Sequence, residues 1–208
     1  MKCAALQLNL IVGDFEGNAA KILDGVRRAA QGGAELCITS ELALWGYPAR
    51  DLLLNPGWVD TSLQVLETLA EDLKDLPPTL VGFAAKRDAH ASGKPLSNAA
   101  ALLRHGQIEH VFQKTLLPTY DVFDEARYFE SSSGSHLLEL DGKRIGITIC
   151  EDTDHDGIAD KFTVFESARE HFRMRATFKL WHEGGQVAYA MFDPDDEART
   201  PHEVVAYP

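Results

Sequence analysis

Basic residues, cysteines and long apolar runs are all scarce in this sequence of 208 residues. Lysine and arginine total 20 against 32 aspartates and glutamates, and the formal charge of -12 argues against a general binder of nucleic acid or of an anionic membrane. No apolar run approaches the ~20 residues that cross a bilayer. Three cysteines, an odd number at wide spacing, fit a reducing cytoplasm better than a disulfide framework, so we predict a cytoplasmic protein.

Several familiar sequence signals are also missing. The eight histidines show no metal-binding spacing, and there is no internal repeat, no low-complexity tract and no glycine-rich ATP-binding segment. The chain is therefore not expected to adenylate a nucleotide by itself. The first residues, MKCAALQLN, contain one basic residue and two polar ones, which predicts a first strand and not a signal peptide. The 45% hydrophobic and 25% charged residues are typical of a globular protein with one substantial core.

Hydrophobic periodicity predicts an α/β protein that begins with a β-α-β unit. Apolar residues alternate through 6–10, as in a strand with one buried face. A helix follows, for which Asn18 is a candidate cap, and it stops at the glycine pair 32–33. A second helix is predicted between Trp58 and Lys74. Further strands are predicted at 36–39, 79–85, 97–104, 107–112, 136–140 and 144–149.

Two regions do not fit this regular pattern. Residues 115–135 form a long loop rich in aromatic and acidic side chains, and loops of this length are often functional. After residue 152 the pattern predicts an acidic turn, a short helix at 164–172, a strand over 174–180, a return strand over 187–191 and an acidic surface tail from 193.

Three ionisable residues occupy equivalent positions, because Glu41, Lys114 and Cys150 each follow the end of a predicted strand. Neighbouring strand ends converge in a layered sheet, so these side chains can meet. Together they match a mechanism in which a thiolate attacks an amide, a carboxylate transfers protons and an ammonium stabilises the oxyanion. Alternatively, Cys150 is a buried structural thiol and the other two are solvated charges.

Three segments resemble the signature motifs of the nitrilase superfamily. They are SELALWGYP at 40–48, KTLLPTYDVFDE at 114–125 and ICED at 149–152. Their order and spacing, and the sequence DLLL at 51–54, are most similar to the N-terminal glutaminase domain of glutamine-dependent NAD+ synthetase. The resemblance covers residues 1–152 and implies an α/β fold of the nitrilase type, an α-β-β-α sandwich.

The resemblance implies a role for each matching residue. Glu41 would be the general base, Lys114 the cation beside the oxyanion and Cys150 the nucleophile of a glutaminase that releases ammonia from glutamine. Glu125 would support the lysine. The residues expected to hold the substrate are Tyr47, Tyr120, Phe123 and Glu151, of which the aromatic ones are equally compatible with loop packing.

The same resemblance implies partners. In this family the ammonia feeds an ATP-dependent NAD+ synthetase domain or subunit, the domains pair into homo-oligomers, and amide hydrolysis requires no cofactor. We predict two domains, a nitrilase-like glutaminase domain at 1–152 and a divergent segment at 153–208. A divergent ending, a truncated or frame-altered end and a segment joined from elsewhere all fit the second part.

The acidic turn after Cys150 has the spacing of a calcium loop. Asp152, Asp154, Asp156 and Asp160 occupy ligand positions 1, 3, 5 and 9, with a glycine at position 6. Position 12, where a glutamate would complete the shell, is Thr163. The turn is therefore either a calcium site or an acidic surface turn.

A different class of function also fits the sequence. Since the recognisable motifs stop at residue 152, the chain is alternatively a nitrilase-like scaffold without turnover that acts as a binding or interaction module. The relative reactivity of the three cysteines distinguishes the two hypotheses, because a catalytic thiol has a depressed pKa and reacts quickly near neutral pH.

Overall fold

The computed structural model describes residues 1–120, 123–133, 136–153, 179–183, 186–192 and 201–203. The chain divides into two compact units, Met1–Phe172 and Arg173–Pro208. The predicted boundary after residue 152 lies beside residues outside this description, so it stays a prediction.

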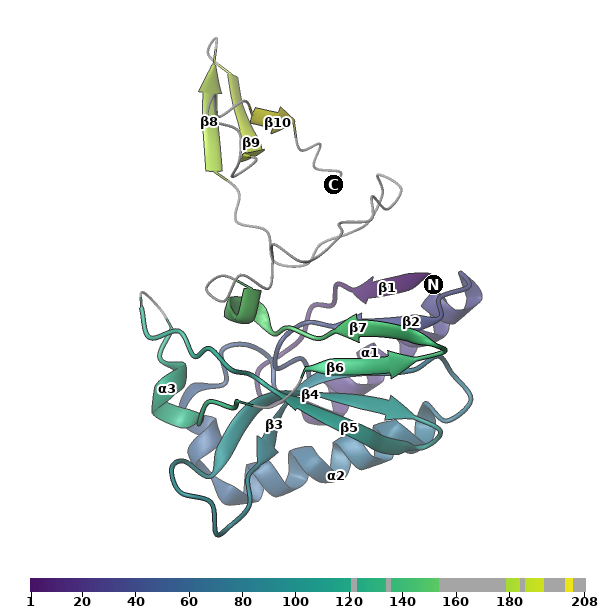
Figure 1. Ribbon diagram of the computed structural model, residues 1–208, viewed down its shortest axis with the longest axis vertical. Coiled ribbons are helices and arrows are strands. Elements are labelled where there is room, and N and C mark those ends of the chain that lie inside the picture. Colours follow the sequence, from purple (N-terminus) through teal and green to yellow (C-terminus); the bar gives the residue numbers. More distant parts are fainter. Residues whose placement is uncertain (121–122, 134–135, 154–178, 184–185, 193–200, 204–208) are drawn as a thin grey trace. The chain divides into compact units, whose positions relative to one another are not determined.

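A five-stranded mixed sheet forms the centre of the first unit (Figure 1). In spatial order its strands are β1 (Cys3–Leu6), β2 (Leu36–Thr39), β3 (Thr79–Lys86), β4 (Leu96–Arg104) and β5 (Gln107–Gln113). The first three are parallel, whereas β4 is antiparallel to both of its neighbours. β2 and β5 therefore end at the same edge of the sheet, which is also the edge where β4 begins.

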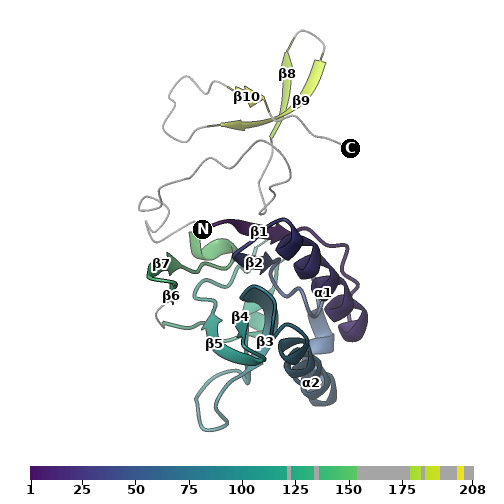
Figure 2. The same ribbon diagram turned by 90° about the vertical axis from the view of Figure 1, so that its right-hand side faces the viewer.

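Two long helices, α1 (Phe15–Gln31) and α2 (Pro56–Asp72), cover one face of this sheet (Figure 2). Their buried residues, such as Ile22 and Leu66, share a core with Val81 of β3 and Ala101 of β4. Burying a side chain of this size stabilises the fold by about 1.5–3 kcal/mol, so this contact layer contributes substantially to the stability of the first unit.

The start of α1 differs from the sequence prediction. The N-cap is Asp14, whose carboxylate accepts the Gly17 N–H at 3.1 Å. Asn18 is not the cap, because it is fully buried within the first turn. Its side-chain amide donates to the carbonyls of Ile11 and Leu44, and its Oδ1 accepts the Ile11 N–H. Asn18 thus joins α1 to the loops that follow β1 and β2.

A two-stranded antiparallel sheet lies on the opposite face (Figure 2). It consists of β6 (Leu137–Leu140) and β7 (Lys143–Gly146). Leu138 and Leu140 pack against Leu102 and Phe112 of the large sheet in a second apolar cluster. The described part of the first unit therefore has an α, β, β layer order, in agreement with the predicted α/β class.

The strand expected to deliver Cys150 is shorter than predicted. β7 ends at Gly146, not at Ile149, and a 3₁₀ helix, η2 (Cys150–Thr153), follows. The strand expected over 6–10 likewise ends at Leu6. The predicted long loop contains the short helix α3 (Glu125–Tyr128), and a further 3₁₀ helix, η1 (Arg50–Leu54), precedes α2.

The second unit contains a three-stranded antiparallel sheet in the order β10-β9-β8. Its strands are β8 (Lys179–Glu183), β9 (Gln186–Phe192) and β10 (Pro201–Glu203). β9 confirms the predicted return strand, whereas β10 lies in the segment predicted to be a tail and pairs with β9. The predicted helix at 164–172 lies outside the described residues. Among the helices in the described ranges, none has the length and apolar surface needed to span a bilayer.

Candidate active site

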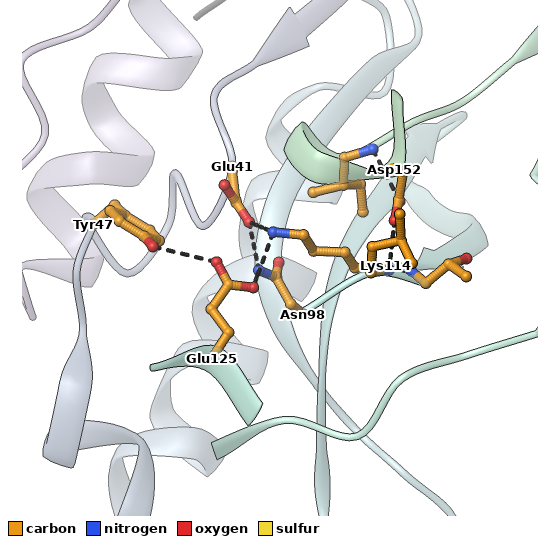
Figure 3. Close-up of polar contacts among 9 residues, drawn as sticks. Glu41, Tyr47, Asn98, Lys114, Glu125 and Asp152 are labelled. Carbon is orange, nitrogen blue, oxygen red and sulfur yellow. Dashed lines mark hydrogen bonds and ion pairs between the residues drawn. The ribbon is translucent and has the colours of Figure 1, made fainter. Parts of the chain in front are cut away.

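Polar side chains from several segments meet at the shared edge of the large sheet (Figure 3). Glu41 follows β2, Lys114 follows β5, and Asn98 lies near the start of β4. Glu125 reaches the same place from α3. The convergence follows from strand direction, because the ends of β2 and β5 and the start of β4 share one edge. The sequence prediction that Glu41 and Lys114 meet is borne out.

Lys114 is a fully buried cation held between two carboxylates. Its Nζ donates to Glu41 Oε1 at 2.6 Å and to Glu125 Oε2 at 2.9 Å. Burial disfavours the charged amine, but the two carboxylates outweigh burial and raise the pKa of Lys114 above its ordinary value. The side chain is therefore a permanently charged donor over the physiological pH range.

Glu125 is the more deeply buried of the two carboxylates, with 5% of its surface exposed. Its Oε1 accepts the phenolic O–H of Tyr47 at 3.2 Å. Burial raises the pKa of Glu125, and the neighbouring charge of Glu41 raises it further, while Lys114 and Asn98 act in the opposite direction. The pKa of Tyr47 is also raised, first by burial and then by the charges of Glu125 and Glu41. Tyr47 therefore stays a neutral hydrogen-bond donor.

Asn98 belongs to this site, although it lies outside the three signature motifs of the sequence. Its Nδ2 donates to Glu41 Oε1 at 2.7 Å and to Glu125 Oε2 at 3.2 Å. The residue is fully buried. One signal in the sequence could have identified it: an amide within the otherwise apolar strand LSNAAALLR, where an uncompensated polar group is costly.

The close approach of two chain segments fixes the position of Glu41. Leu42 has a φ of 49°, so the chain turns sharply after Glu41. Gly82 of β3 lies directly beneath the turn, and a Cβ atom there would lie only 2.6 Å from the Leu42 nitrogen. The Gly82 N–H donates to Thr39 Oγ1 at 3.0 Å. A glycine is needed at this point because the backbone that carries Glu41 occupies the space of a side chain.

Cys150 begins η2 in a left-handed backbone conformation, with a φ of 51°. Such a φ is unfavourable for a residue other than glycine and persists only where the surroundings stabilise it. Asp152 supplies that stabilisation. Its Oδ2 accepts the Ile149 N–H at 3.1 Å, and its Oδ1 accepts the N–H groups of Thr115 and Leu116 at 2.9 and 2.7 Å. The Asp152 carboxylate therefore ties the turn that carries Cys150 to the residues directly after Lys114 (Figure 3).

The calcium prediction assigned Asp152 a different role. Its buried carboxylate, with 3% of the residue exposed, is already bonded to three backbone N–H groups. Asp154, Asp156 and Asp160 lie outside the described residues. Within the described ranges no group of three metal-ligating side chains occurs, so the calcium site stays a prediction. Thermal unfolding with calcium and with a chelator tests it.

The environments of the three cysteines differ. All three lie in described ranges, and none of them forms a disulfide. Burial raises the pKa of Cys37 to about 11 and also raises that of Cys3. Cys150 is partly exposed and interacts electrostatically with Tyr47, whose hydroxyl reaches Glu125. Cys37 is thus a core thiol, whereas Cys150 lies close enough to Tyr47 for its charge to help raise the pKa of that phenol.

Three predicted substrate-binding aromatics form a connected row. The ring centroids of Tyr47 and Phe123 are 6.2 Å apart, and those of Phe123 and Tyr120 are 5.7 Å apart. The side chain of Glu151, the fourth predicted residue, lies outside the description. A cavity of about 360 Å³ borders Tyr47 and Glu125 and extends past Asp51 and Asp124. The aromatic row therefore reaches from the edge of this cavity to the exposed ring of Tyr120.

A comparison with protein families shows to which family the chain belongs. The carbon-nitrogen hydrolase family model matches residues 2–183. The chain belongs to the carbon-nitrogen hydrolase family. This result confirms the predicted nitrilase-type family and fold.

Two relatives show which members of the family the chain is similar to. The chain is 45% identical over 155 residues to a glutamine-dependent NAD(+) synthetase of Synechocystis, and 36% identical over 154 residues to that of Thermotoga maritima. These matches cover 74% and 73% of this chain but only 28% and 26% of the two relatives. The chain therefore aligns with about a quarter of each synthetase, the N-terminal glutaminase segment, as the motifs predicted.

Solved structures give the same result. The glutamine-dependent NAD+ synthetase of Acinetobacter baumannii superposes with a TM-score of 0.69 and 32% identity, over 76% of this chain and 29% of that one. An amidase of Nesterenkonia, a member of the nitrilase superfamily, superposes with a TM-score of 0.59 at 22% identity, over 74% of this chain and 57% of that one. The second match shows a shared fold.

Proposed function

We propose that this chain is a cysteine-dependent glutaminase in which Cys150, Glu41 and Lys114 carry the reaction. The observation that supports the proposal most strongly is the buried Lys114, held 2.6 Å from Glu41 and 2.9 Å from Glu125. Burying a lysine with two carboxylates costs desolvation energy that well-packed apolar residues would avoid, so the arrangement is better explained by chemistry than by stability.

The proposed reaction has two halves. In the first, Glu41 takes the proton of the Cys150 thiol, and the sulfur attacks the γ-carbonyl carbon of glutamine. Lys114 and the Glu151 backbone N–H stabilise the oxyanion. The intermediate collapses, the carbon–nitrogen bond breaks, and Glu41 returns the proton to the leaving nitrogen, which departs as ammonia.

In the second half, water gives a proton to Glu41 and attacks the thioester. The carbon–sulfur bond breaks, the thiolate regains the proton, and glutamate leaves. The net reaction is glutamine plus water to glutamate plus ammonia, and it requires no cofactor. Glu125 supports both halves, because a second carboxylate beside Lys114 keeps the ammonium charged at every step.

The relatives' activity suggests the fate of the ammonia. Because the aligned proteins are glutamine-dependent NAD(+) synthetases, we propose that it passes to an ATP-dependent NAD+ synthetase domain or subunit. A homo-oligomer and a cytoplasmic location belong to the same proposal. Tyr47, Tyr120 and Phe123 are proposed to contact the glutamine, because their connected rings border the cluster.

Ammonia release from glutamine tests the assignment. A Cys150→Ala variant should lower the rate by about 10⁴-fold or more, since the covalent route is lost. Cys3→Ala is the matched control and should retain the wild-type rate. A Cys150→Ala protein that releases ammonia as fast as wild type would refute the assignment.

Thiol labelling separates an enzyme from a scaffold without turnover. Cys150 should react with iodoacetamide well before Cys3 and Cys37 at neutral pH, because burial raises the pKa of both other thiols. If all three thiols react equally slowly and no ammonia is released, the chain acts as a binding or interaction module instead.

A further inference from the structure

One of the two polar atoms of the Asn98 side chain is buried and, within the described part of the chain, unsatisfied. The residue is fully buried, and its Oδ1 is a buried acceptor without a hydrogen-bond partner among the described residues. A buried polar atom left unsatisfied is destabilising. An apolar side chain of similar shape would avoid this penalty, as Leu102 does further along β4 on the same face. The role of the Asn98 amide is therefore expected to lie in the hydrogen bonds that its Nδ2 donates.

The nitrogen completes a ring of four hydrogen bonds (Figure 3). Asn98 Nδ2 and Lys114 Nζ each donate to both Glu41 Oε1 and Glu125 Oε2. Two donors thus fix one oxygen of each carboxylate. Among the described contacts, every hydrogen bond of the Glu41 carboxylate goes to Oε1, which leaves Oε2 to exchange protons with the reacting groups.

We propose that Asn98 is a positioning residue that sets the orientation of the carboxylate pair. The inference rests on the proposed glutaminase function. Asn98 itself does not touch the substrate in this scheme. It prevents the Glu41 carboxylate from turning both oxygens toward Lys114, and it stabilises the ionised form of Glu125 in a site where burial favours the protonated form.

Asn98→Leu is the informative substitution. Leucine has the same number of side-chain heavy atoms and the same branching as asparagine, although its methyl groups occupy more space, and it leaves both ion pairs of Lys114 in place. We expect a kcat at least ~10-fold lower, with KM changed by less than about twofold. Asn98→Ala removes the same two hydrogen bonds, and its small side chain fits the site without displacing its neighbours.

The pH dependence distinguishes positioning from simple packing. Without the amide donor, the pKa of Glu125 should rise, and the acidic limb of the kcat profile should move to higher pH. Ser97→Ala is the matched control. Ser97 is the adjacent residue of β4, is equally buried with an unsatisfied hydroxyl, and points to the opposite face of the sheet. The Ser97→Ala substitution should leave the pH dependence of kcat unchanged.

A carboxyl NMR titration keeps this test independent of turnover. Protein labelled with ¹³C at the glutamate carboxyl carbon, with the signal assigned through Glu125→Gln, reports the titration of Glu125 directly. Wild-type protein that releases no ammonia would refute the glutaminase proposal, while an upward shift of the Glu125 titration in Asn98→Leu would still support the positioning role. A Glu125 titration and an acidic limb that both stay at their wild-type positions in the Leu and Ala variants would overturn it.

Discussion

Removing the Asp152 carboxylate should separate the turn of Cys150 from the segment after Lys114. The carboxylate is nearly fully buried and accepts three backbone N–H groups at 2.7–3.1 Å, those of Thr115, Leu116 and Ile149. A hydrogen bond to a charged group contributes about 1.5–3 kcal/mol. Because the three bonds share one carboxylate, their contributions are not additive, and we expect Asp152→Ala to lower the free energy of unfolding by about 3–5 kcal/mol.

The substitution Asp152→Asn should have an intermediate effect. The amide oxygen can still accept the N–H groups of Thr115 and Leu116. The amide nitrogen, however, replaces the oxygen that bonds Ile149, so two donors face each other. We expect a loss of about 1–3 kcal/mol, the cost of one unsatisfied buried N–H. The structure therefore predicts an order of stability in which wild type exceeds Asn and Asn exceeds Ala.

Urea unfolding measures this order. With a slope of about 2 kcal/mol/M, the Ala variant should unfold at a urea concentration roughly 1.5–2.5 M lower than wild type, without a change in slope. Asp88→Ala is the control, because Asp88 is exposed and its carboxylate accepts a single backbone N–H, from His90. An Ala variant within about 1 kcal/mol of wild type, or an Asn variant as unstable as Ala, would refute the reasoning.

Two further substitutions test the site. Burial and the charge of Glu41 raise the pKa of Glu125 above 4.5. Protonated Glu125 therefore adds to the free energy of unfolding, fully below about pH 4.5, and this contribution is lost as the pH rises through the raised pKa. The thermal midpoint of wild type relative to Glu125→Gln should fall over that interval, and a constant difference would contradict the assignment. Gly82→Ala should displace Glu41, with a loss of about 1–3 kcal/mol and at least ~10-fold in ammonia release, because the added Cβ meets the backbone. Gly25→Ala, where the nearest atom is 3.4 Å away, should retain wild-type activity.

Regular elements could be predicted because their residues follow one period throughout. The strand at 36–39 and the hairpin of β4 and β5 have the predicted positions, since local pattern and burial agree there. The strand predicted at 144–149 ends early, although Ile147 and Ile149 favour a strand. The Ile149 N–H bonds to Asp152 instead of to a neighbouring strand. A contact made only in the folded structure therefore overrides the local preference.

The candidate site could be predicted in part for similar reasons. Glu41 and Lys114 follow strand ends, so their meeting depends on strand order alone. Asn98 could not be found by that argument, because it lies inside a strand and its partners are distant in the sequence. The spacing of Asp152 and the acidic residues after it predicts a calcium loop, and this stays a prediction. The described contacts of the Asp152 carboxylate are backbone N–H groups, which no side-chain pattern reveals.

The complete burial of Lys114 also makes it a reporter of motion. An amine-modifying reagent, like the glutamine of the proposed reaction, can reach its Nζ only when the surrounding side chains move apart, whereas an exposed amine such as that of Lys74 reacts quickly. The ratio of the two modification rates therefore gives the population of the open state, expressed as a local free energy of opening. Opening breaks the ion pairs of Lys114 with Glu41 and Glu125. The free energy of opening therefore measures how strongly these contacts hold the site together, and the measurement needs neither substrate nor turnover.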